Sequence, residues 1–359
     1  MEANELLARL RKKIDSIDFE ILKLINQRME HTLRTRKLKA NISDPGREQE
    51  IIASLRRRSS ALIRSEFSEI LFKEIISESK LLQRKDLKLI GFQGEHGAYG
   101  EVAIRIVDNS LVPIPCMEFV DVFDEVINRQ LDFGIVPVEN SLEGAVTQVN
   151  DLLVETDVHK IKIVGEVKIP IHHCLLASPG TDYHEIKVVY SHPQALAQCR
   201  RFLSKHRLES RPYYDTAGAA MMLSKEKPRA AAAIASKLCA ELYNLDVLFE
   251  DIEDNETNAT RFLILSNEES NKAGNKCSIV FSTEHKAGAL FNILKIFSDA
   301  GLNLTRIESR PIRNDPGKYA FLLDFLGSDR EEKVIAALEK ARKETVIFKF
   351  LGCYNEAPQ

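Results

Sequence analysis

The 359-residue chain contains no tryptophan, no Cys-x-x-Cys pair and no long hydrophobic run. Its six cysteines lie far apart, so neither a zinc knuckle nor a disulfide framework is indicated. No apolar stretch approaches the roughly 18 residues of a membrane-spanning helix, and we expect no membrane partner. The N-terminus has no basic stretch followed by an apolar core, which argues against a secretory signal and favours a cytoplasmic location.

Charge is nearly balanced overall but unevenly distributed along the chain. The net charge is -3, yet residues 1–85 hold 19 Lys and Arg against 13 Asp and Glu, so the remainder is acidic. The N-terminal part therefore suits an anionic ligand, and charge alone does not choose between nucleic acid and an acidic metabolite. The length, at about 150 residues per domain, predicts two or three domains.

The first predicted domain, residues 1–85, has the periodicity of helices. Between residues 6 and 39 the apolar residues recur at alternating steps of three and four, which predicts one long amphipathic helix. These residues are Leu7, Leu10, Ile14, Ile17, Ile21 and Leu24. The same register places Arg28 in the apolar seam, where a buried charge needs a partner. A short helix to about residue 57 and a third from about 61 to 84 are expected to follow.

Helical phase relates the polar residues of this domain to one another. Arg28 and Lys39 are eleven residues apart, which returns them to within roughly 20° of one helix face. Arg11 and Arg28, seventeen residues apart, are roughly 100° out of phase, so one helix cannot aim both at one pocket. A second copy of the helix could. Ser79 and Gln83 form an i, i+4 pair on one face of the third helix.

The order of these residues resembles the all-helical chorismate mutases, in which a dimer builds each active site with one arginine from the partner chain. The resemblance covers residues 6–85. It implies that Arg11 of the other chain, Arg28 and Arg47 bind carboxylates. It also implies that Lys39 and Gln83 face the ether oxygen that breaks in the reaction.

The same resemblance assigns the remaining polar residues to the substrate ring. Asp44 and Glu48 would orient the ring hydroxyl, with Ser79 at the pocket edge. Chorismate rearranges by a pericyclic route that needs no acid, base or covalent intermediate. Catalysis is then positioning plus electrostatic stabilisation.

The second predicted domain, residues 86–267, alternates short strands with helices, which predicts an α/β domain with a largely parallel sheet. Four loops that follow strands begin with small and polar residues that open a helix, and such loops gather at the carboxyl edge of a sheet. The loops are residues 94–99, 139–144, 191–194 and 215–218. Neither the dinucleotide fingerprint nor metal-ligand spacing is present, so no cofactor and no metal are expected. His172-His173 is expected to be a structural pair in a strand, with one ring buried.

Three ordered motifs lie in this domain, namely Glu139-Asn140-Ser141, Ser191-His192-Pro193-Gln194 and Thr260-Arg261-Phe262. Together they resemble the prephenate and arogenate dehydratases. The resemblance implies two α/β lobes similar to type 2 periplasmic binding proteins, with the substrate in the cleft. The family reaction expels CO₂ and the ring hydroxide together, so it needs a general acid and no base.

This resemblance also implies roles for the motif residues. Thr260 would act at the leaving hydroxyl, and Arg261 would set a carboxylate or buttress the loop. Glu139 is the alternative acid. The remaining matches would offer hydrogen bonds to the substrate, and they are Asn140, Ser141, Gln194, Thr216 and Ala217.

The third predicted domain, residues 275–355, reads βαββαβ, the ferredoxin-like arrangement. Gly288-Ala289-Leu290 at a helix start and Glu308-Ser309-Arg310-Pro311 at a strand end resemble the ACT regulatory domains of the dehydratases. In that family both motifs form a phenylalanine site between subunits. Phe291 stands where the family pattern has valine. A plain oligomerisation module is the alternative.

The three resemblances together imply a bifunctional enzyme of phenylalanine synthesis. It would convert chorismate to prephenate and prephenate to phenylpyruvate, as a homodimer or larger homo-oligomer inhibited by phenylalanine, with no nucleic-acid partner. One alternative is a fused dehydratase that acts only on arogenate. Another is a DNA-binding regulator with a two-lobed effector domain, which the length of the first helix disfavours because a recognition helix is short and follows a tight turn.

Overall fold

The computed structural model describes residues 2–58, 62–270, 272–312, 315 and 317–357. The chain divides into two compact units, Met1–Leu89 and Ile90–Gln359. Within the described residues, no helix combines the length and the apolar character needed to cross a membrane.

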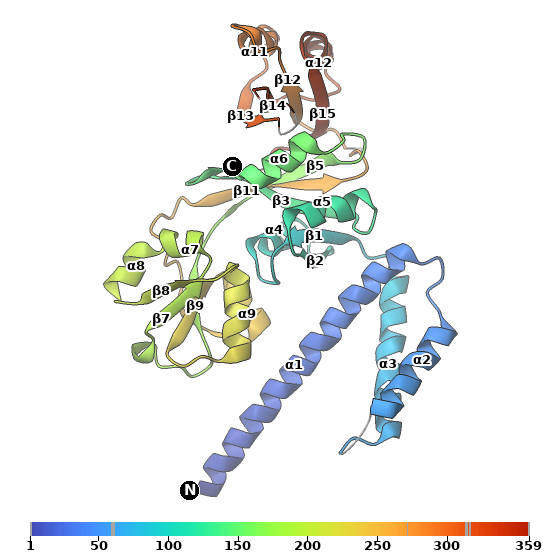
Figure 1. Ribbon diagram of the computed structural model, residues 1–359, viewed down its shortest axis with the longest axis vertical. Helices are drawn as coiled ribbons and strands as arrows, with labels where there is room; N and C mark the ends of the chain where they lie inside the picture. Colours follow the sequence, from blue (N-terminus) through green and yellow to red (C-terminus); the bar gives the residue numbers. More distant parts are fainter. Residues whose placement is uncertain (1, 59–61, 271, 313–314, 316, 358–359) are drawn as a thin grey trace. The chain divides into compact units, whose positions relative to one another are not determined.

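The N-terminal unit is helical, as predicted, with α1 (Glu2–Leu38), α2 (Pro45–Arg58) and α3 (Ser65–Arg84) (Figure 1). Both α1 and α2 pack against α3. Asp44 Oδ1 accepts the backbone N–H of Arg47 at 3.0 Å, as an N-cap side chain does, and Pro45 suits the first helical position. The Asp44 carboxylate therefore serves to begin α2 and lies exposed at its end.

The first lobe of the second unit is a sheet in the order β2-β1-β3-β11-β5, with β4 paired to β3. Its strands are β1 (Leu89–Gln93), β2 (Val112–Cys116), β3 (Phe133–Asn140), β4 (Gly144–Ala145), β5 (Lys162–Pro170) and β11 (Ala259–Ser266). Its helices are α4 (Tyr99–Val107), α5 (Phe119–Ile127) and α6 (Thr147–Glu155). β1 and β3 are parallel, whereas β11 runs antiparallel to both β3 and β5.

The second lobe is a sheet in the order β10-β6-β9-β7-β8. Its strands are β6 (Cys174–Ala177), β7 (Val188–Ser191), β8 (Glu209–Pro212), β9 (Ala231–Ala235) and β10 (Asp246–Phe249). Its helices are α7 (Pro193–Gln198), α8 (Arg200–Lys205), α9 (Thr216–Glu226), α10 (Lys237–Tyr243) and the short 3₁₀ helix η1 (Tyr183–Glu185). The two-lobed α/β prediction is confirmed, but each sheet is mixed. β11 enters the first sheet after the second crossover between lobes and runs antiparallel to its neighbours β3 and β5. β6 enters the second sheet after the first crossover and runs antiparallel to its neighbours β9 and β10.

The C-terminal domain has the predicted βαββαβ order, with sheet order β13-β14-β12-β15. Its elements are β12 (Lys276–Ser282), α11 (Ala289–Asp299), β13 (Leu304–Pro311), β14 (Tyr319–Leu326), α12 (Glu332–Glu344) and β15 (Ile347–Tyr354). Phe281, Phe297 and Phe325 are fully buried in its core. β15 lies against β5 of the first lobe, and a side chain at Gly352 would clash with the carbonyl of Ile163. The close contact therefore requires glycine, which also accepts the positive φ of this position.

Candidate active sites

Arg28, Ser79 and Gln83 meet between α1 and α3. Arg28 Nη1 donates to Ser79 Oγ at 2.6 Å, and Gln83 Nε2 donates to the backbone oxygen of Thr32 at 2.7 Å. Ser79 and Gln83 are buried, while Arg28 is half-buried. Burial lowers the pKa of the Arg28 guanidinium, which nevertheless stays charged. The Ser79 hydroxyl is a neutral partner, so it does not neutralise the positive charge of Arg28. That charge remains available to bind a carboxylate at this seam.

The other predicted residues of this unit lie toward the connection between α1 and α2. Lys39 and Arg47 are exposed, and Arg47 Nη1 lies 3.0 Å from Glu50 Oε2. Glu48 is half-buried, and its carboxylate lies 2.7 Å from Lys80 Nζ of α3. The ion pair ties Glu48 to the helix that carries Ser79 and Gln83, whereas an exposed pair such as that of Arg47 contributes little stability.

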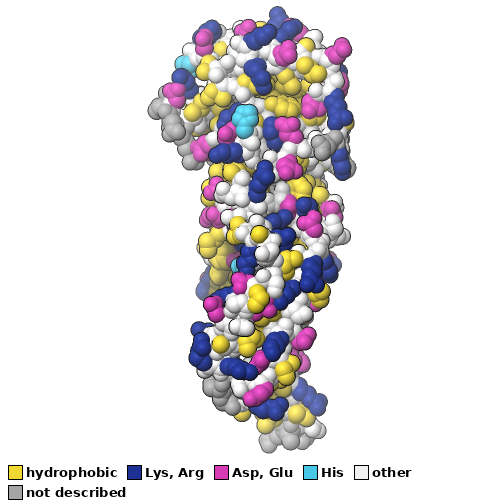
Figure 2. All heavy atoms as spheres, turned by 90° about the vertical axis from the view of Figure 1, so that its right-hand side faces the viewer, with side chains coloured by type: hydrophobic (Ala, Val, Ile, Leu, Met, Phe, Trp, Pro, Cys, Tyr) yellow, Lys and Arg dark blue, Asp and Glu magenta, His cyan; other side chains and the backbone are white. Residues whose placement is uncertain are grey.

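Arg11 lies on the exposed N-terminal half of α1. It precedes Arg28 by seventeen residues of continuous helix, which at 1.5 Å per residue is roughly 25 Å along the axis. One chain therefore does not bring Arg11 to the Arg28 site. The apolar stripe around Arg11 is 46 to 59% exposed at Leu7, Leu10, Ile14, Ile17 and Ile21. Figure 2 shows that apolar side chains also lie among Lys and Arg side chains elsewhere on the surface, on the face of the molecule that it draws.

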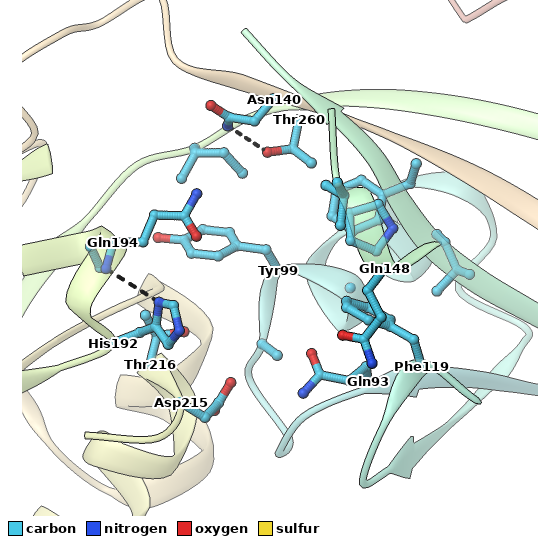
Figure 3. Close-up of a pocket in the computed structure, with 18 of the residues that line it drawn as sticks. Gln93, Tyr99, Phe119, Asn140, Gln148, His192, Gln194, Asp215, Thr216 and Thr260 are labelled. Atoms are coloured by element: carbon cyan, nitrogen blue, oxygen red, sulfur yellow. Dashed lines mark hydrogen bonds between the residues drawn. The ribbon is translucent and has the colours of Figure 1, made fainter. Parts of the chain in front are cut away.

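A cavity of about 390 Å³ lies between the two lobes of the second unit (Figure 3). The first lobe contributes polar side chains from β1, β3, α6 and β11, and the second lobe contributes the starts of α7 and α9. The labelled lining residues are Gln93, Tyr99, Phe119, Asn140, Gln148, His192, Gln194, Asp215, Thr216 and Thr260. Among the described residues that line it, none is lysine or arginine. Its polar lining consists of neutral side chains, helix starts and the carboxyl groups of Glu118 and Asp215, so the donors available to an anion are neutral groups and helix N-termini.

Thr260 and Asn140 face each other across β11 and β3. Thr260 Oγ1 accepts from Asn140 Nδ2 at 3.0 Å, and Asn140 Nδ2 also donates to Asn258 Oδ1 at 2.8 Å. Asn140 Oδ1 accepts the backbone N–H groups of Leu142 and Glu143, which fixes the direction of the amide. Because Thr260 Oγ1 accepts the hydrogen bond from Asn140 Nδ2, the Thr260 hydroxyl group can donate its own hydrogen into the cavity.

The neighbours of these two residues point away from the cleft, because successive side chains of a strand lie on opposite faces. Arg261 Nε lies 2.7 Å from Glu166 Oε2, and Arg261 Nη2 lies 2.7 Å from Asp324 Oδ2 of the C-terminal domain. Glu139 Oε2 is 3.9 Å from Arg261 Nη1. The predicted contributions of Glu139, Ser141 and Arg261 to the cleft are therefore not seen. These residues line a second cavity, on the other side of the sheet.

At the second lobe, Thr216 and Gln194 line the cleft, whereas Ala217 is fully buried inside the lobe. Asp215 begins α9, and its Oδ1 accepts the backbone N–H of Gly218 at 2.7 Å. Burial raises the pKa of the Asp215 carboxyl, although the bond from Gly218 acts in the opposite direction. Burial therefore favours the protonated form of Asp215, which makes it a second candidate proton donor in the cleft.

The sequence did not single out the hydrogen-bonded chain of Tyr99, His173 and Gln198 beside Thr260. Gln198 Oε1 accepts from Asn258 Nδ2 at 3.1 Å, so His173 Nε2, 2.8 Å away, donates to the same oxygen. His173 Nδ1 then accepts from the Tyr99 hydroxyl at 2.8 Å. A protonated ring would donate from both nitrogens, and the Tyr99 hydroxyl would turn to the His172 carbonyl at 2.6 Å. The pair His172-His173 was the available signal, and one ring is indeed buried, in the crossover after β5 rather than within a strand.

The burial of His173 predicts a pH dependence of stability. His173 is 2% exposed, and burial lowers its pKa even though the bond to Gln198 acts to raise it. As the pH falls below about 6.5 the unfolded chain binds this proton first, so the free energy of unfolding decreases. We expect melting temperatures measured from pH 8 to 5 to fall less steeply for His173→Gln than for wild type. Equal slopes would contradict this, and His159→Gln, an exposed histidine, serves as the control.

A group of potential metal ligands lies at the same crossover. His172 Nδ1 is 2.8 Å from Glu253 Oε1 and 3.3 Å from Asp251 Oδ1. Glu253 Oε2 also accepts the backbone N–H of His173 at 2.9 Å. These side chains could surround an ion, but their mutual bonds equally explain their placement. The expected absence of a metal stays a prediction.

The two predicted regulatory motifs lie at the start of α11 and on the edge strand β13. Gly288, with φ +82°, precedes α11, and Ala289 lines a cavity of about 220 Å³. Leu290 packs against the core of the domain, and the neighbouring Phe291 is 65% exposed. On β13, Ser309 is exposed whereas Glu308 and Arg310 are half-buried. Arg310 donates from Nε to Asp151 Oδ1 of α6 at 2.5 Å.

Comparison with known proteins follows the same three parts. Family models match in order along the chain: chorismate mutase type II over residues 10–84, prephenate dehydratase over residues 90–270 and the ACT domain over residues 278–343. The bifunctional chorismate mutase/prephenate dehydratase of Pseudomonas aeruginosa is 36% identical over 99% of this chain and 100% of its own length.

Solved structures resemble the larger part of the chain. The prephenate dehydratase from Arthrobacter aurescens, solved in complex with L-Phe, is 33% identical with a TM-score of 0.68, over 75% of this chain and 90% of that one. GqqA, described as a quorum quenching acylase, is 30% identical with the same TM-score, over 76% of this chain and 99% of that one.

Proposed function

Because the chain belongs to the family of bifunctional chorismate mutase/prephenate dehydratases, we propose which of its residues perform each reaction and how the product controls them. The protein is an isomerase and a carbon–oxygen lyase, and it converts chorismate to prephenate and prephenate to phenylpyruvate. We assign the mutase to residues 1–85, the dehydratase to residues 86–267 and regulation to residues 275–355.

Thr260 is the residue that protonates the leaving hydroxyl of prephenate. The observation that carries this assignment is the bond from Asn140 Nδ2 to Thr260 Oγ1, which leaves the threonine hydrogen for the substrate. The ring hydroxyl then leaves as water while the C–C bond to the carboxylate breaks and CO₂ departs with the ring becoming aromatic. Proton donation of this kind typically accelerates a reaction by about 100- to 10,000-fold.

The lack of lysine and arginine among the described residues lining the cleft suits this chemistry. The ring carboxylate loses its charge as CO₂ forms, so a cation bound to it would stabilise the substrate more than the transition state. Neutral donors bind an anion without that penalty. We assign Gln93, Gln148 and Gln194, together with the start of α9 at Thr216, to binding the two carboxylates of prephenate.

In the helical unit, Arg28 clamps a carboxylate of chorismate, with Ser79 holding the guanidinium in place. Gln83 and Lys39 stabilise the negative charge that develops on the ether oxygen as the bond breaks. Arg47 also binds a carboxylate of the substrate, while Asp44 and Glu48 orient the hydroxyl group of the ring. No cofactor is proposed for either reaction.

We assign the exposed apolar stripe of α1 to contact with a second copy of the chain. A helix of 37 residues is about 55 Å long, and α3 covers only part of it. Exposed apolar surface of this extent marks an interaction site. A partner helix that covers the stripe would also deliver Arg11, which one chain leaves roughly 25 Å from its own Arg28.

The shared mutase site predicts complementation between two inactive variants. Each of Arg11→Ala and Arg28→Ala alone should lose mutase activity. A mixed dimer should have one intact site, because the Arg11→Ala chain keeps its own Arg28 and receives Arg11 from its partner. We expect partial recovery of chorismate turnover after subunit exchange.

The matched control mixes Arg28→Ala with Lys39→Ala. Each site takes both Arg28 and Lys39 from one chain. In this mixed dimer each chain lacks one of these two residues, so neither site is complete. No recovery in the first mixture, with exchange verified by mass spectrometry, would exclude a shared site.

We further propose feedback inhibition by phenylalanine bound at Gly288-Ala289-Leu290 and at Glu308 and Ser309 of the second motif in the C-terminal domain. The resemblance to a dehydratase solved with L-Phe supports it, and the amide groups at the start of α11 suit a carboxylate. Glu308 would accept the ammonium group. The edge strand β13 leaves the site open to completion by a second subunit.

One assay tests the whole proposal. Purified protein is supplied with chorismate, and prephenate and phenylpyruvate are followed with and without phenylalanine. We expect prephenate to appear and be consumed, and phenylalanine to slow its consumption. Chorismate loss without phenylpyruvate, together with turnover of added arogenate, would instead support the arogenate alternative.

A further inference from the structure

Helix α6 connects the cleft to the C-terminal domain. Its start belongs to the cleft, because Val146 and Gln148 line the cavity. Its far side contacts β13 and β14 of the C-terminal sheet. In Figure 1, α6 accordingly lies where the first lobe meets the C-terminal strands.

Three cations of the C-terminal domain hold α6. Arg306 Nη2 donates to Asn150 Oδ1 at 2.5 Å, and Arg310 Nε donates to Asp151 Oδ1 at 2.5 Å. At the other end, Lys349 Nζ of β15 donates to the backbone oxygens of Val154 and Thr156, at 2.5 and 2.9 Å. Lysine at a helix C-terminus satisfies carbonyl groups that have no partner inside the helix.

The contacts that Arg306 and Arg310 make with α6 are largely excluded from water. Asn150 is fully buried, and the side chains of Asp151 and Arg310 are 14% and 18% exposed. The hydrogen bond and charge of Asp151 raise the pKa of Arg310. A buried bond of this kind is broken only at a cost, so movement of β13 moves α6 with it.

We infer that α6 transmits the state of the C-terminal domain to the dehydratase cleft, with Asp151 and Arg310 as its positioning contact; this rests on the phenylalanine regulation proposed above. Arg310 then has a different role from the one its motif predicts. Its guanidinium is engaged by the dehydratase lobe, so it reports the position of β13 rather than binding the effector.

Two hydrogen bonds connect α6 to β3, the strand that carries Asn140. Asn150 Nδ2 donates to the carbonyl of Val138 on β3 at 3.4 Å, and the backbone N–H of Val146 donates to the same carbonyl at 2.9 Å. Two residues farther along β3, Asn140 holds Thr260. A shift of α6 therefore alters both a wall of the cavity and the strand that orients the acid.

The experiment removes the charge of Asp151 in the full-length protein. Asp151→Asn should leave kcat and KM for prephenate near wild type and should still bind phenylalanine by calorimetry. The inhibition factor is the rate without phenylalanine divided by the rate at saturating phenylalanine. It should decrease by at least about fivefold, or reach one, which means no inhibition. This size is expected because allosteric couplings commonly span about 5- to 150-fold. Asp151→Glu keeps the charge and should retain inhibition.

Two further variants make the result decisive. Lys349→Met removes the contact at the other end of α6 and should also reduce inhibition by phenylalanine. This variant tests the inference independently if Asp151→Asn folds poorly. Glu209→Gln breaks an exposed carboxylate–arginine pair in the second lobe and should change nothing. Full inhibition in both Asp151→Asn and Lys349→Met would overturn this inference while leaving the proposed regulation intact. A wild-type protein that phenylalanine does not inhibit would overturn both.

Discussion

Thr260→Val should lower the dehydratase kcat by about 100- to 10,000-fold while prephenate still binds. The substitution keeps the shape of the side chain and removes only the hydroxyl that donates to the leaving group. The amide of Asn140 keeps its bond to Asn258 Oδ1, and the Ala259 carbonyl, 3.3 Å away, accepts its other hydrogen, so no buried donor is left without an acceptor and the fold should be retained. Rapid-quench measurement of phenylpyruvate from added prephenate tests this, with mutase activity as an internal standard.

Two matched variants sharpen this test. Thr257→Val removes an exposed threonine hydroxyl three residues away and should leave the rate unchanged. Glu139→Gln should also stay near wild type, because this carboxylate lies on the other face of the sheet. If Thr260→Val keeps wild-type rates, the proton comes from elsewhere, and Asp215 is the next candidate since burial raises its pKa.

Arg28→Ala should lower chorismate rearrangement by about 100- to 1,000-fold or more, with dehydration of added prephenate unchanged. The guanidinium is the charge that the α1–α3 seam holds ready for a carboxylate. Without it, the Ser79 hydroxyl keeps its bond to the Ile75 carbonyl and can accept a hydrogen bond from water. Each activity is measured separately on the same preparation, which excludes global unfolding as the cause.

The control for this variant is Arg57→Ala, which removes an exposed arginine from the end of α2. It should keep full mutase activity, because loss of one positive charge from the surface does not alter the pocket. Arg28→Lys should recover only part of the rate, since an ammonium group does not reproduce the two-pronged geometry of a guanidinium. Wild-type turnover in Arg28→Ala would refute the assignment of this site.

Much of the cleft could be predicted because most of its residues lie where strands end and helices begin. Asn140 ends β3, and Gln194 and Thr216 lie at the starts of helices that follow strands, where the carboxyl edge of a sheet gathers such segments together. Thr260 reaches the same edge from the start of β11, because β11 runs antiparallel to β3. The residues of one motif do not all reach the cleft. Within Glu139-Asn140-Ser141 only the central residue faces the cavity, since strand neighbours alternate between faces, and the same alternation turns Arg261 away.

The chain of Tyr99, His173 and Gln198 could not be predicted from local pattern. Each residue lies in or beside a stretch with a clear sequence signal, yet the contact forms only where the two crossovers between lobes pass one another. His173 follows β5 and Asn258 precedes β11, 85 positions apart in the sequence. Local periodicity carries no information about such a meeting.

The sequence by itself determined the three-part organisation, the long first helix and the separation of Arg11 from Arg28, because these depend on periodicity and on the fixed geometry of a helix. Only the tertiary structure decided the roles of Arg261 and Arg310. Both belong to motifs that suggested ligand contacts, and both are paired with carboxylates of another domain, Asp324 and Asp151. A charged side chain interacts most strongly with charges within a few ångströms. For Arg261 and Arg310 these charges come from another domain, so the packing of the domains determines the partner and the residues next to each arginine in the chain do not.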